Sequence, residues 1–232
     1  MDKTEIGMSL DDIDKIVHDY IIADDAYPSA INFHNFPKSV CTSVNDVVSH
    51  GVPNSYILKD GDYLNIDVVC FKHGHHGDNS GMVMLGNVHP DIVKLSEVTR
   101  ESMFKAIEIC KPGAKFSQIG AEIEDYAHDR GYSVNQEFGG HGIAHELHLA
   151  PLVHHYREKK GTKAEMRPGM AFTIEPILMM NGKYGYVQWD DGWTVHAPGV
   201  PSCQWEHIIL ITEDGYEILT RREGEVSPFA DK

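Results

Sequence analysis

Hydrophobic residues recur at helical spacing in three stretches of the chain. Residues 7–20 (GMSLDDIDKIVHDY) and 113–126 (GAKFSQIGAEIEDY) carry apolar side chains three and four positions apart, each entered through a Ser or Asp cap. A longer stretch, residues 90–110, ends at KPG. The pattern therefore predicts three amphipathic helices.

Four other stretches have the composition of strands. Residues 63–71 (YLNIDVVCF) and 75–85 (HHGDNSGMVML) flank KHG, which is typical of a hairpin turn. Residues 167–180 (RPGMAFTIEPILMM) and 201–212 (PSCQWEHIILIT) contain apolar runs that indicate buried strands. Strands and helices in this order predict an α+β fold.

The predicted hairpin brings two carboxylates together. If residues 72 and 73 form its tip, Asp67 lies opposite Asp78, with Cβ atoms roughly 5 Å apart. Like charges in facing positions are destabilising unless a cation lies between them.

A third carboxylate, Glu175, stands within the predicted strand 167–180. Burying a charge without a partner costs several kcal/mol or more. Glu175 therefore needs a partner that its neighbours in the sequence do not supply.

An internal repeat relates Glu175 to Asp67. Residues 58–67 (LKDGDYLNID) match residues 166–175 (MRPGMAFTIE) at an offset of 108, which places Asp67 on Glu175. The helices 7–20 and 113–126 match at an offset of 106. Two matches in the same order predict a duplicated unit, so Glu206 in strand 201–212 is expected to mirror Asp78.

The two halves differ before their first matched helix. Residues 90–110 precede the second copy, but only six residues precede Gly7. The first half is therefore expected to lack its opening helix. The apolar surface left by that helix would lower stability or associate with a partner.

Composition excludes several classes of protein. The chain of 232 residues is 41% hydrophobic and 24% charged, which suits one large globular domain or two small ones. Its net charge of −15 argues against nucleic acid as the main ligand. No apolar run is long enough to span a membrane. The four cysteines form no C-x-x-C pair, and the N-terminus resembles no targeting peptide, so we expect reduced thiols in the cytoplasm.

Four converging carboxylates suit two divalent metal ions. Asp67, Asp78, Glu175 and Glu206 would hold ions roughly 3.5–4 Å apart with bridging oxygens. A mixed site would also use nitrogen, but spacing does not choose among the histidines near GGHGIAHELH, which are His141, His145, His148 and His154. HELH is not the zincin motif, because its histidines are three residues apart rather than four.

The motifs NFPKSVCTSVNDVVSHGVP, LKDGDYLNIDV, HHGDNSG, GGHGI, FTIEP and QWEH resemble those of type I methionine aminopeptidases, in order and in spacing. The resemblance covers residues 7–222, and the 34 positions between His141 and Glu175 suit type I. It implies the pita-bread fold, with pseudo-twofold halves around a curved antiparallel sheet. It also implies one catalytic domain over residues 1–232, with halves of roughly 7–88 and 90–222, and a monomer.

The resemblance also implies a set of site residues. The metal ligands would be Asp67, Asp78, His141, Glu175 and Glu206. Glu175 would also shuttle protons, and His50 and His148 would contact the substrate and stabilise the oxyanion or the leaving amide. The methionine pocket would comprise Ala30, Phe33, Phe36, Cys41, Leu147 and Trp193. A weak monovalent-cation site would involve Asn45, Val47 and Ser202.

Four pocket positions depart from the family pattern. Phe33 and Phe36 stand where Tyr is common, Leu147 where Phe is usual, and Ala30 where Cys is frequent. Each change keeps the pocket apolar but alters its depth or rim, so the preference for the second residue of the substrate would change.

The expected function is metal-dependent removal of the initiator methionine from a peptide or nascent chain whose second residue is small. The metal is open among Mn, Fe, Co and Zn, because a carboxylate-rich site with one histidine accepts each of them. Two alternatives are a related dinuclear X-Pro peptidase or prolidase, and a non-catalytic binding protein of the same fold. The five retained ligands and the FPKSVCTSVN and NIDV motifs favour the methionine enzyme.

Overall fold

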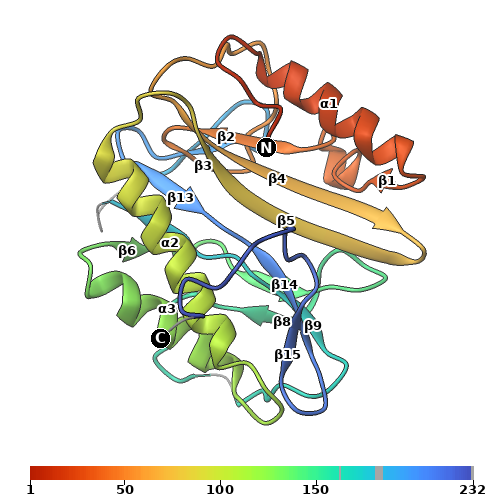
Figure 1. The fold of residues 1–232 in the computed structure, drawn as a ribbon, viewed down its shortest axis with the longest axis vertical. Helices are drawn as coiled ribbons and strands as arrows, with labels where there is room; N and C mark the ends of the chain where they lie inside the picture. Colours follow the sequence, from red (N-terminus) through yellow and green to blue (C-terminus); the bar gives the residue numbers. More distant parts are fainter. Residues whose placement is uncertain (162, 181–184, 231–232) are drawn as a thin grey trace.

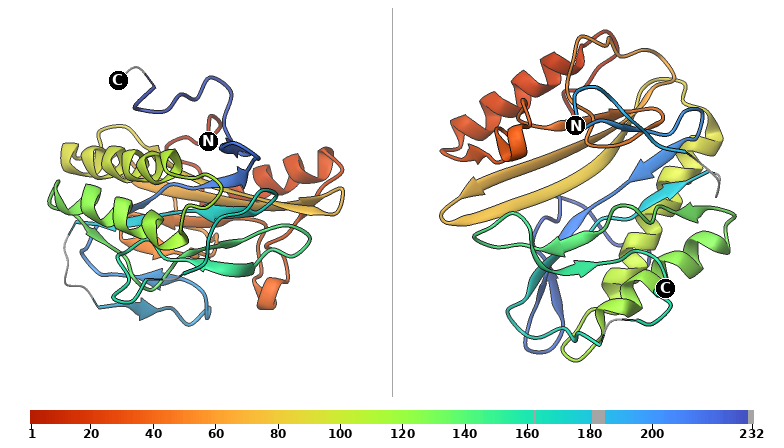
Figure 2. Two further views of the ribbon diagram at one scale, coloured as in Figure 1. Left: turned by 90° about the horizontal axis from the view of Figure 1, so that it is seen from below. Right: turned by 180° about the vertical axis from the view of Figure 1, so that it is seen from behind.

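Three helices lie towards one side of a set of antiparallel strands (Figures 1 and 2). The structure is a computed structural model that describes residues 1–161, 163–180 and 185–230. The helices are α1 (Leu10–Ala23), α2 (Pro90–Glu108) and α3 (Phe116–His128), with one 3-10 turn at Phe33–Asn35. All three predicted helices are confirmed, with ends shifted by a few residues. No helix in the described ranges is long and apolar enough to cross a membrane.

Within the described residues, the strands form four antiparallel sheets. One sheet contains β1, β4, β2 and β5, and the largest has the order β15-β14-β9-β7-β8. The two others are β13-β10-β6 and β11-β12-β3. The strands are β1 Tyr27–Pro28, β2 Cys41–Val44, β3 Val47–Ser49, β4 Tyr63–Lys72, β5 His75–Met84, β6 Ser133–Val134, β7 Gly140–Gly142, β8 Leu149–Val153, β9 Ala171–Ile174, β10 Ile177–Met179, β11 Val187–Gln188, β12 Val195–His196, β13 Ser202–Gln204, β14 His207–Ile211 and β15 Tyr216–Ile218.

The two halves repeat the same backbone contacts. The N–H of Gly7 donates to the carbonyl of Leu58, and the N–H of Gly113 donates to that of Met166, both at 2.9 Å. An isolated bridge joins Ser9 to Ile57 in the first half, and Lys115 is bridged to Glu165 in the same way. These pairs have the offsets of 106 and 108 residues found in the sequence, which confirms the duplication.

The predicted hairpin is confirmed, but its register was wrong. The tip is His73-Gly74, which have φ values of 50° and 85°. Left-handed backbone at both loop positions matches the twist of a two-residue hairpin, and glycine adopts it without strain. Asp67 consequently pairs with Ser80, and Asp78 pairs with Val69. The shift is two residues, so the two carboxylates stay on the same face as diagonal neighbours.

Two predicted long strands are each broken. The strand expected at 167–180 ends at Ile174 as β9 and resumes at Ile177 as β10. The strand expected at 201–212 divides in the same way into β13 and β14. Pro176 has no N–H to continue the ladder, and β14 pairs with β9 whereas β13 pairs with β10. The breaks therefore lie beside one another.

The main core lies where α2 and α3 cover the strands of the second half. Its largest side chains, Phe104 and Phe172, are at most 1% exposed, and Phe116 packs edge-on against Phe172. A smaller core of α1, β4 and neighbouring residues serves the first half.

The two halves differ at the position of α2. Within the described ranges no helix lies beside α1 as α2 lies beside α3, and a groove of about 890 Å³ runs there instead. The groove is lined partly by Ile13, Val17, Ile66 and Val68. Association over this surface stays a prediction.

Candidate metal centre

All the residues expected in the metal centre and methionine pocket line one cavity. It has a volume of about 580 Å³ and receives side chains from both halves of the chain. Lining residues include Ala30, Phe33, Phe36, Cys41, His50, Asp67, Asp78, His141, Leu147, His148, Glu175, Trp193 and Glu206. Asn45, Val47 and Ser202, expected to hold a monovalent cation, are not among them.

Asp67 and Asp78 reach the cavity because strand alternation places them on one face of the β4–β5 hairpin. The side chain of Asp78 is only 7% exposed. Oδ1 of Asp67 is buried and has no hydrogen-bond partner in the described part of the chain. A buried carboxylate oxygen without a donor is costly, and a bound cation is one partner that would satisfy it.

Glu175 and Glu206 reach the cavity from the two strand breaks. Ile174 pairs with His207 and Ile177 pairs with Gln204, so Glu175 occupies the position that faces Glu206. The breaks turn both carboxylates away from the ladder. Each half of the chain thus contributes two acidic side chains to one point.

His141 supplies nitrogen to this cluster from β7. Its Nε2 lies 3.6 Å from Oδ2 of Asp78 and 3.6 Å from Oε1 of Glu175. The other ring nitrogen, Nδ1, lies 3.1 Å from the carbonyl of Gly142, which directs Nε2 towards the carboxylates. One ligand atom from each of Asp78, His141 and Glu206 lies within 4.8 Å of the others.

The glycines beside His141 have a packing role. A Cβ on Gly140 would lie 2.3 Å from the carbonyl oxygen of Thr173, and one on Gly142 would lie 2.4 Å from that of Ala150. Only glycine lets β7 approach its neighbours β9 and β8 this closely. Close packing of the strands, rather than ligand access alone, accounts for the GGHG sequence.

The acidic side chains have raised pKa values. Burial raises the pKa of Asp67 and of Glu206 well above the usual range, and neighbouring carboxylates raise both further. Burial also raises the pKa of Glu175 to about 7. Burial lowers the pKa of His141, but the hydrogen bond and charges of Asp78 and Glu175 outweigh it and raise that pKa overall. Positive charge is what this cluster lacks, and bound cations would supply it.

The donor set fits divalent metal ions. Carboxylate oxygens with one imidazole nitrogen suit divalent first-row metals, and four carboxylates are enough to hold two ions. The oxygen of Asp67 without a partner and the distances around His141 agree with this chemistry.

Histidines and aromatic rings form the rest of the cavity wall. The ring centroids of His148 and His141 are 4.2 Å apart, and His148 also contacts Phe33 edge-on at 5.1 Å. Trp193 contacts Phe36 at 5.2 Å and His50 at 5.8 Å. His50 has a φ of 55°, a strained conformation for a non-glycine residue.

Burial keeps both of these histidines neutral near pH 7. It lowers the pKa of His50, and it lowers the pKa of His148 to about 4, where the charge of His141 also contributes. A neutral imidazole presents one N–H donor and one acceptor nitrogen.

The sequence reasoning missed three residues that hold Glu175. The hydroxyl of Thr173 donates to Oε1 of Glu175 at 2.7 Å, and Nε2 of Gln204 donates to Oε2 at 3.3 Å. The buried His155 accepts from the backbone N–H of Glu175 at 3.2 Å. The sequence offered a signal for Thr173 alone, which stands two positions before Glu175 and therefore on the same face of an extended chain.

The other two histidines considered from the sequence lie elsewhere. His145 is exposed, and Nε2 of His154 pairs with Oε1 of Glu158 at 3.1 Å. Neither lines the cavity. Residues 144–148 are not helical, in agreement with the rejection of a zincin helix.

Comparison with known proteins identifies the family. The model of metallopeptidase family M24 matches residues 1–213. The chain is 46% identical over 216 residues to methionine aminopeptidase 1D, chloroplastic/mitochondrial, of Arabidopsis thaliana, covering 93% of this chain and 61% of that protein. It is 43% identical over 215 residues to methionine aminopeptidase 2 of Mycobacterium tuberculosis, covering 92% and 75%. The chain thus spans about three-fifths of the length of the Arabidopsis relative.

Solved structures agree with this result. The methionine aminopeptidase of Rickettsia prowazekii superposes with a TM-score of 0.91 at 39% identity, covering 95% of this chain and 89% of that one. The prolidase of Pyrococcus furiosus shares the fold alone, with a TM-score of 0.74 at 20% identity.

The fold and the carboxylate-histidine cluster define a metallopeptidase of the pita-bread class. The chain belongs to metallopeptidase family M24. Within that family, its sequence and fold are similar to those of methionine aminopeptidases.

Proposed function

We propose that this protein is a type I methionine aminopeptidase, which removes the initiator methionine from peptides or nascent chains. The observation that carries the proposal is the convergence of the four carboxylates and His141 with an aromatic pocket in one cavity. The similarity to methionine aminopeptidases over more than nine-tenths of the chain supports the same activity.

Asp67, Asp78, His141, Glu175 and Glu206 would hold two divalent ions in this proposal. Such ions supply Lewis-acid activation of a water molecule and of the scissile carbonyl group. Mn, Fe, Co and Zn all suit the donor set. A monovalent cation at Asn45, Val47 and Ser202 remains a further proposal from the family resemblance.

Glu175 is the proposed proton carrier. Thr173 fixes Oε1 of its carboxylate and Gln204 fixes Oε2, so the group faces the cavity in one orientation. A carboxyl group held beside the reacting atoms can accept a proton and return it in the same catalytic cycle. In this role Glu175 takes the proton of the attacking water and gives it to the leaving amine.

His50 and His148 are the proposed hydrogen-bond donors to the reacting amide. Both are neutral near pH 7 and line the cavity beside the carboxylates. Their N–H groups would stabilise negative charge on the carbonyl oxygen as it develops, and the surrounding aromatic rings would exclude water.

The apolar part of the cavity is the proposed methionine pocket. Phe36 and Leu147 are buried at its wall, with Trp193 edge-on to Phe36. Selection by size in such a pocket is worth about 1–3 kcal/mol per methylene. The free α-amine of the substrate would meet the carboxylates, which confines cleavage to the first peptide bond.

Peptide hydrolysis tests this proposal against an X-Pro peptidase. We expect the metal-loaded protein to release methionine from Met-Ala-Ser and to leave an X-Pro dipeptide uncut. Metal content should be measured on the same sample. Cleavage of the X-Pro dipeptide alone would contradict the proposal.

The remaining attributes are proposals too. A single catalytic domain with halves of roughly 7–88 and 90–222, and a monomer, are proposed from the same resemblance, whereas a cytoplasmic location is proposed from the cysteine pattern and the N-terminal sequence. All four cysteines are free thiols, as expected in a reducing compartment.

A further inference from the structure

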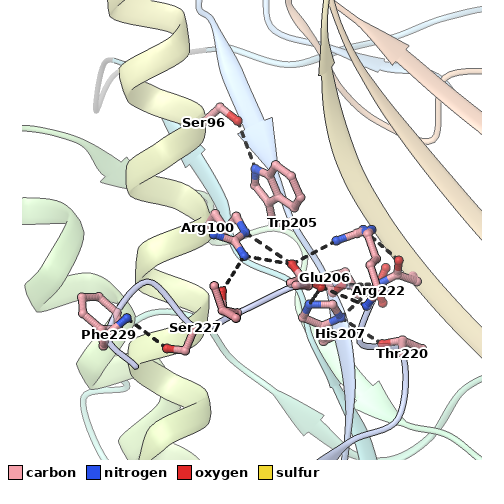
Figure 3. Close-up of polar contacts among 12 residues, drawn as sticks. Ser96, Arg100, Trp205, Glu206, His207, Thr220, Arg222, Ser227 and Phe229 are labelled. Atoms are coloured by element: carbon pink, nitrogen blue, oxygen red, sulfur yellow. Dashed lines mark hydrogen bonds and ion pairs between the residues drawn. The ribbon is translucent and has the colours of Figure 1, made fainter. Parts of the chain in front are cut away.

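A network of polar contacts surrounds Glu206 and His207 (Figure 3). Asp78 and Glu206 face the cavity, whereas their sequence neighbours Asn79 and His207 are absent from its lining. Consecutive residues of an extended chain point to opposite sides, so Asn79 and His207 meet on the reverse side.

Asn79 and His207 connect the two ligand-bearing segments directly. The side-chain amide of Asn79 donates to the backbone carbonyl of Glu206, and it lies 3.2 Å from Nδ1 of His207. The backbone N–H of Glu206 donates to the carbonyl of Ser80 at 3.2 Å. Neither carboxylate-bearing segment can therefore move without the other.

The C-terminal segment fixes this connection through Arg222. Its Nη2 donates to Oδ1 of Asn79 at 2.8 Å and to the carbonyl of Ser80 at 2.9 Å. The bond to Oδ1 selects one orientation of the Asn79 amide, with its nitrogen turned towards Glu206 and His207.

The carboxylate of Glu225 contacts two arginines and a histidine of the network. Its Oε1 pairs with Arg100 of α2 at 3.1 Å and with Arg222 at 3.4 Å, and its Oε2 lies 3.2 Å from Nε2 of His207. Oε2 also accepts the backbone N–H of Arg222 at 3.1 Å. Its side chain is 7% exposed, so loss of its charge would leave two guanidinium groups and an imidazole without their shared partner.

Thr220 and Glu225 together orient the ring of His207. The hydroxyl of Thr220 accepts from the N–H of Ile208 at 2.9 Å and lies 3.0 Å from Nδ1 of His207. A hydroxyl proton directed at Nδ1 leaves the imidazole proton on Nε2, which lies 3.2 Å from Oε2 of Glu225 without forming an aligned hydrogen bond to it.

We propose that Glu225 is a positioning residue for the metal centre, acting through Arg222, Asn79 and His207 on the backbone that carries Asp78 and Glu206. This inference rests on the proposed metal centre. The C-terminal segment would thereby set the spacing between Asp78 and Glu206, which lie on the opposite side of the sheet. Partners behind the direct ligands commonly contribute 10–100-fold to metal affinity.

The test is Mn²⁺ binding to metal-stripped full-length protein, measured by calorimetry below the unfolding temperature of every variant. Glu225→Gln should weaken Mn²⁺ binding by about 10-fold or more. Glu223→Gln is the matched control, because it removes the same charge two residues away from an exposed side chain. We expect it to bind Mn²⁺ as the wild type does.

Further variants separate positioning from general stabilisation. Arg222→Lys keeps the charge but loses the paired donors to Asn79 and Ser80, and it should weaken Mn²⁺ binding even if Glu225→Gln does not fold. If Glu225 acts through Asn79, the Glu225→Gln and Asn79→Ala effects on the dissociation constant should not multiply in the double variant.

Three outcomes would overturn the inference in different ways. Wild-type affinity in Glu225→Gln, with normal Mn²⁺ binding by the wild type, would refute the positioning role and leave the metal centre intact. Absence of binding by the wild type of each of Mn²⁺, Co²⁺ and Zn²⁺, tested separately, would refute the metal centre itself. A lower melting temperature of the metal-free variant with an unchanged Mn²⁺ dissociation constant would show a purely structural role.

Discussion

Thr173 offers a sharp test of how the protein holds Glu175, the proposed proton carrier. Its hydroxyl donates to Oε1 of Glu175 at 2.7 Å and accepts from the backbone N–H of His141 at 2.9 Å. The residue is 0% exposed, so water cannot replace either bond. Thr173→Val keeps the shape of the side chain and removes both interactions.

The expected cost follows from these two bonds. A hydrogen bond to a charged group is worth about 1.5–3 kcal/mol, and an orphaned buried N–H costs about 1–3 kcal/mol. Thr173→Val should therefore lower the free energy of unfolding by about 3–5 kcal/mol. In a chain of this size that is a loss on the order of 10 °C in melting temperature.

Thr173→Ser is the matched control, because it keeps the hydroxyl and loses only a methyl group. Its cost should be about 1 kcal/mol. Thermal unfolding of both variants, with metal removed and at one pH, measures the difference. Equal losses for the two variants would show that the hydroxyl contributes nothing beyond its volume, and the reasoning would fail.

Four further predictions concern the site and its support. Asp78→Asn should abolish peptidase activity and leave the far-ultraviolet circular dichroism unchanged; normal turnover would exclude the dinuclear account. Removal of metal with a chelator should abolish activity, and divalent metal should restore it. Trp193→Ala removes two edge-on ring contacts from the pocket wall and should lower kcat/KM for methionine peptides roughly 5–150-fold, because two contacts at about 0.5–1.5 kcal/mol each sum to about 1–3 kcal/mol. Burial raises the pKa of Glu225, but the contacts with His207, Arg222 and Arg100 outweigh burial and lower that pKa to about 2. The contribution of the Glu225 carboxylate to the free energy of unfolding should therefore be complete above pH 4.5 and lost between pH 4.5 and 2. The free energy of unfolding, measured against pH, should be about 1–2 kcal/mol lower for Glu225→Gln than for the wild type at neutral pH, a figure reduced for the partial exposure of both arginines. Near pH 2 the two proteins should be equally stable. A difference that stays constant with pH would contradict this prediction.

The sequence predicted the duplication and the carboxylates because both depend on local patterns. Gly7 and Gly113 have φ values of 94° and 83°, and Gly61 and Gly169 have 91° and 84°. Only glycine adopts such angles without strain, so equivalent positions of the two halves carry the same residue, and the repeat can be recognised in the sequence. The carboxylates stood out because charge is rare in apolar strands.

The hairpin register was predicted incorrectly because turn chemistry was not weighed. Glycine at 74 favours a tip that includes it, and His73 accepts a left-handed conformation beside it. A register error of two residues leaves both side chains on the same face of the hairpin. The conclusion that Asp67 and Asp78 lie together is therefore correct although the predicted pairing is wrong.

The sequence indicates one of the two strand breaks but not the other. Pro176 follows Glu175 directly, and proline within an apolar run is a known signal against an unbroken central strand. Trp205 and Glu206 carry no such signal. Their break is imposed by the partner strands, since β13 and β14 pair with segments that are already separated.

The pocket wall was accessible only through the family resemblance. Phe33 and Trp193 lie on irregular segments far apart in the sequence, and periodicity does not relate them. Thr173 and Gln204 were missed for a similar reason, because their role depends on which side-chain oxygens they reach.

In the proposed metal centre, the ligands and the network behind them are connected through the backbone. Asp78 is bonded in sequence to Asn79, and Glu206 to His207, so a displacement on one side of the sheet appears on the other. The network includes Arg100 of α2, which connects the ligand spacing to a helix of the main core. Substitutions at the C-terminal segment should therefore alter metal affinity without touching the cavity. A search for variants with changed metal preference should include that reverse side as well as the ligands.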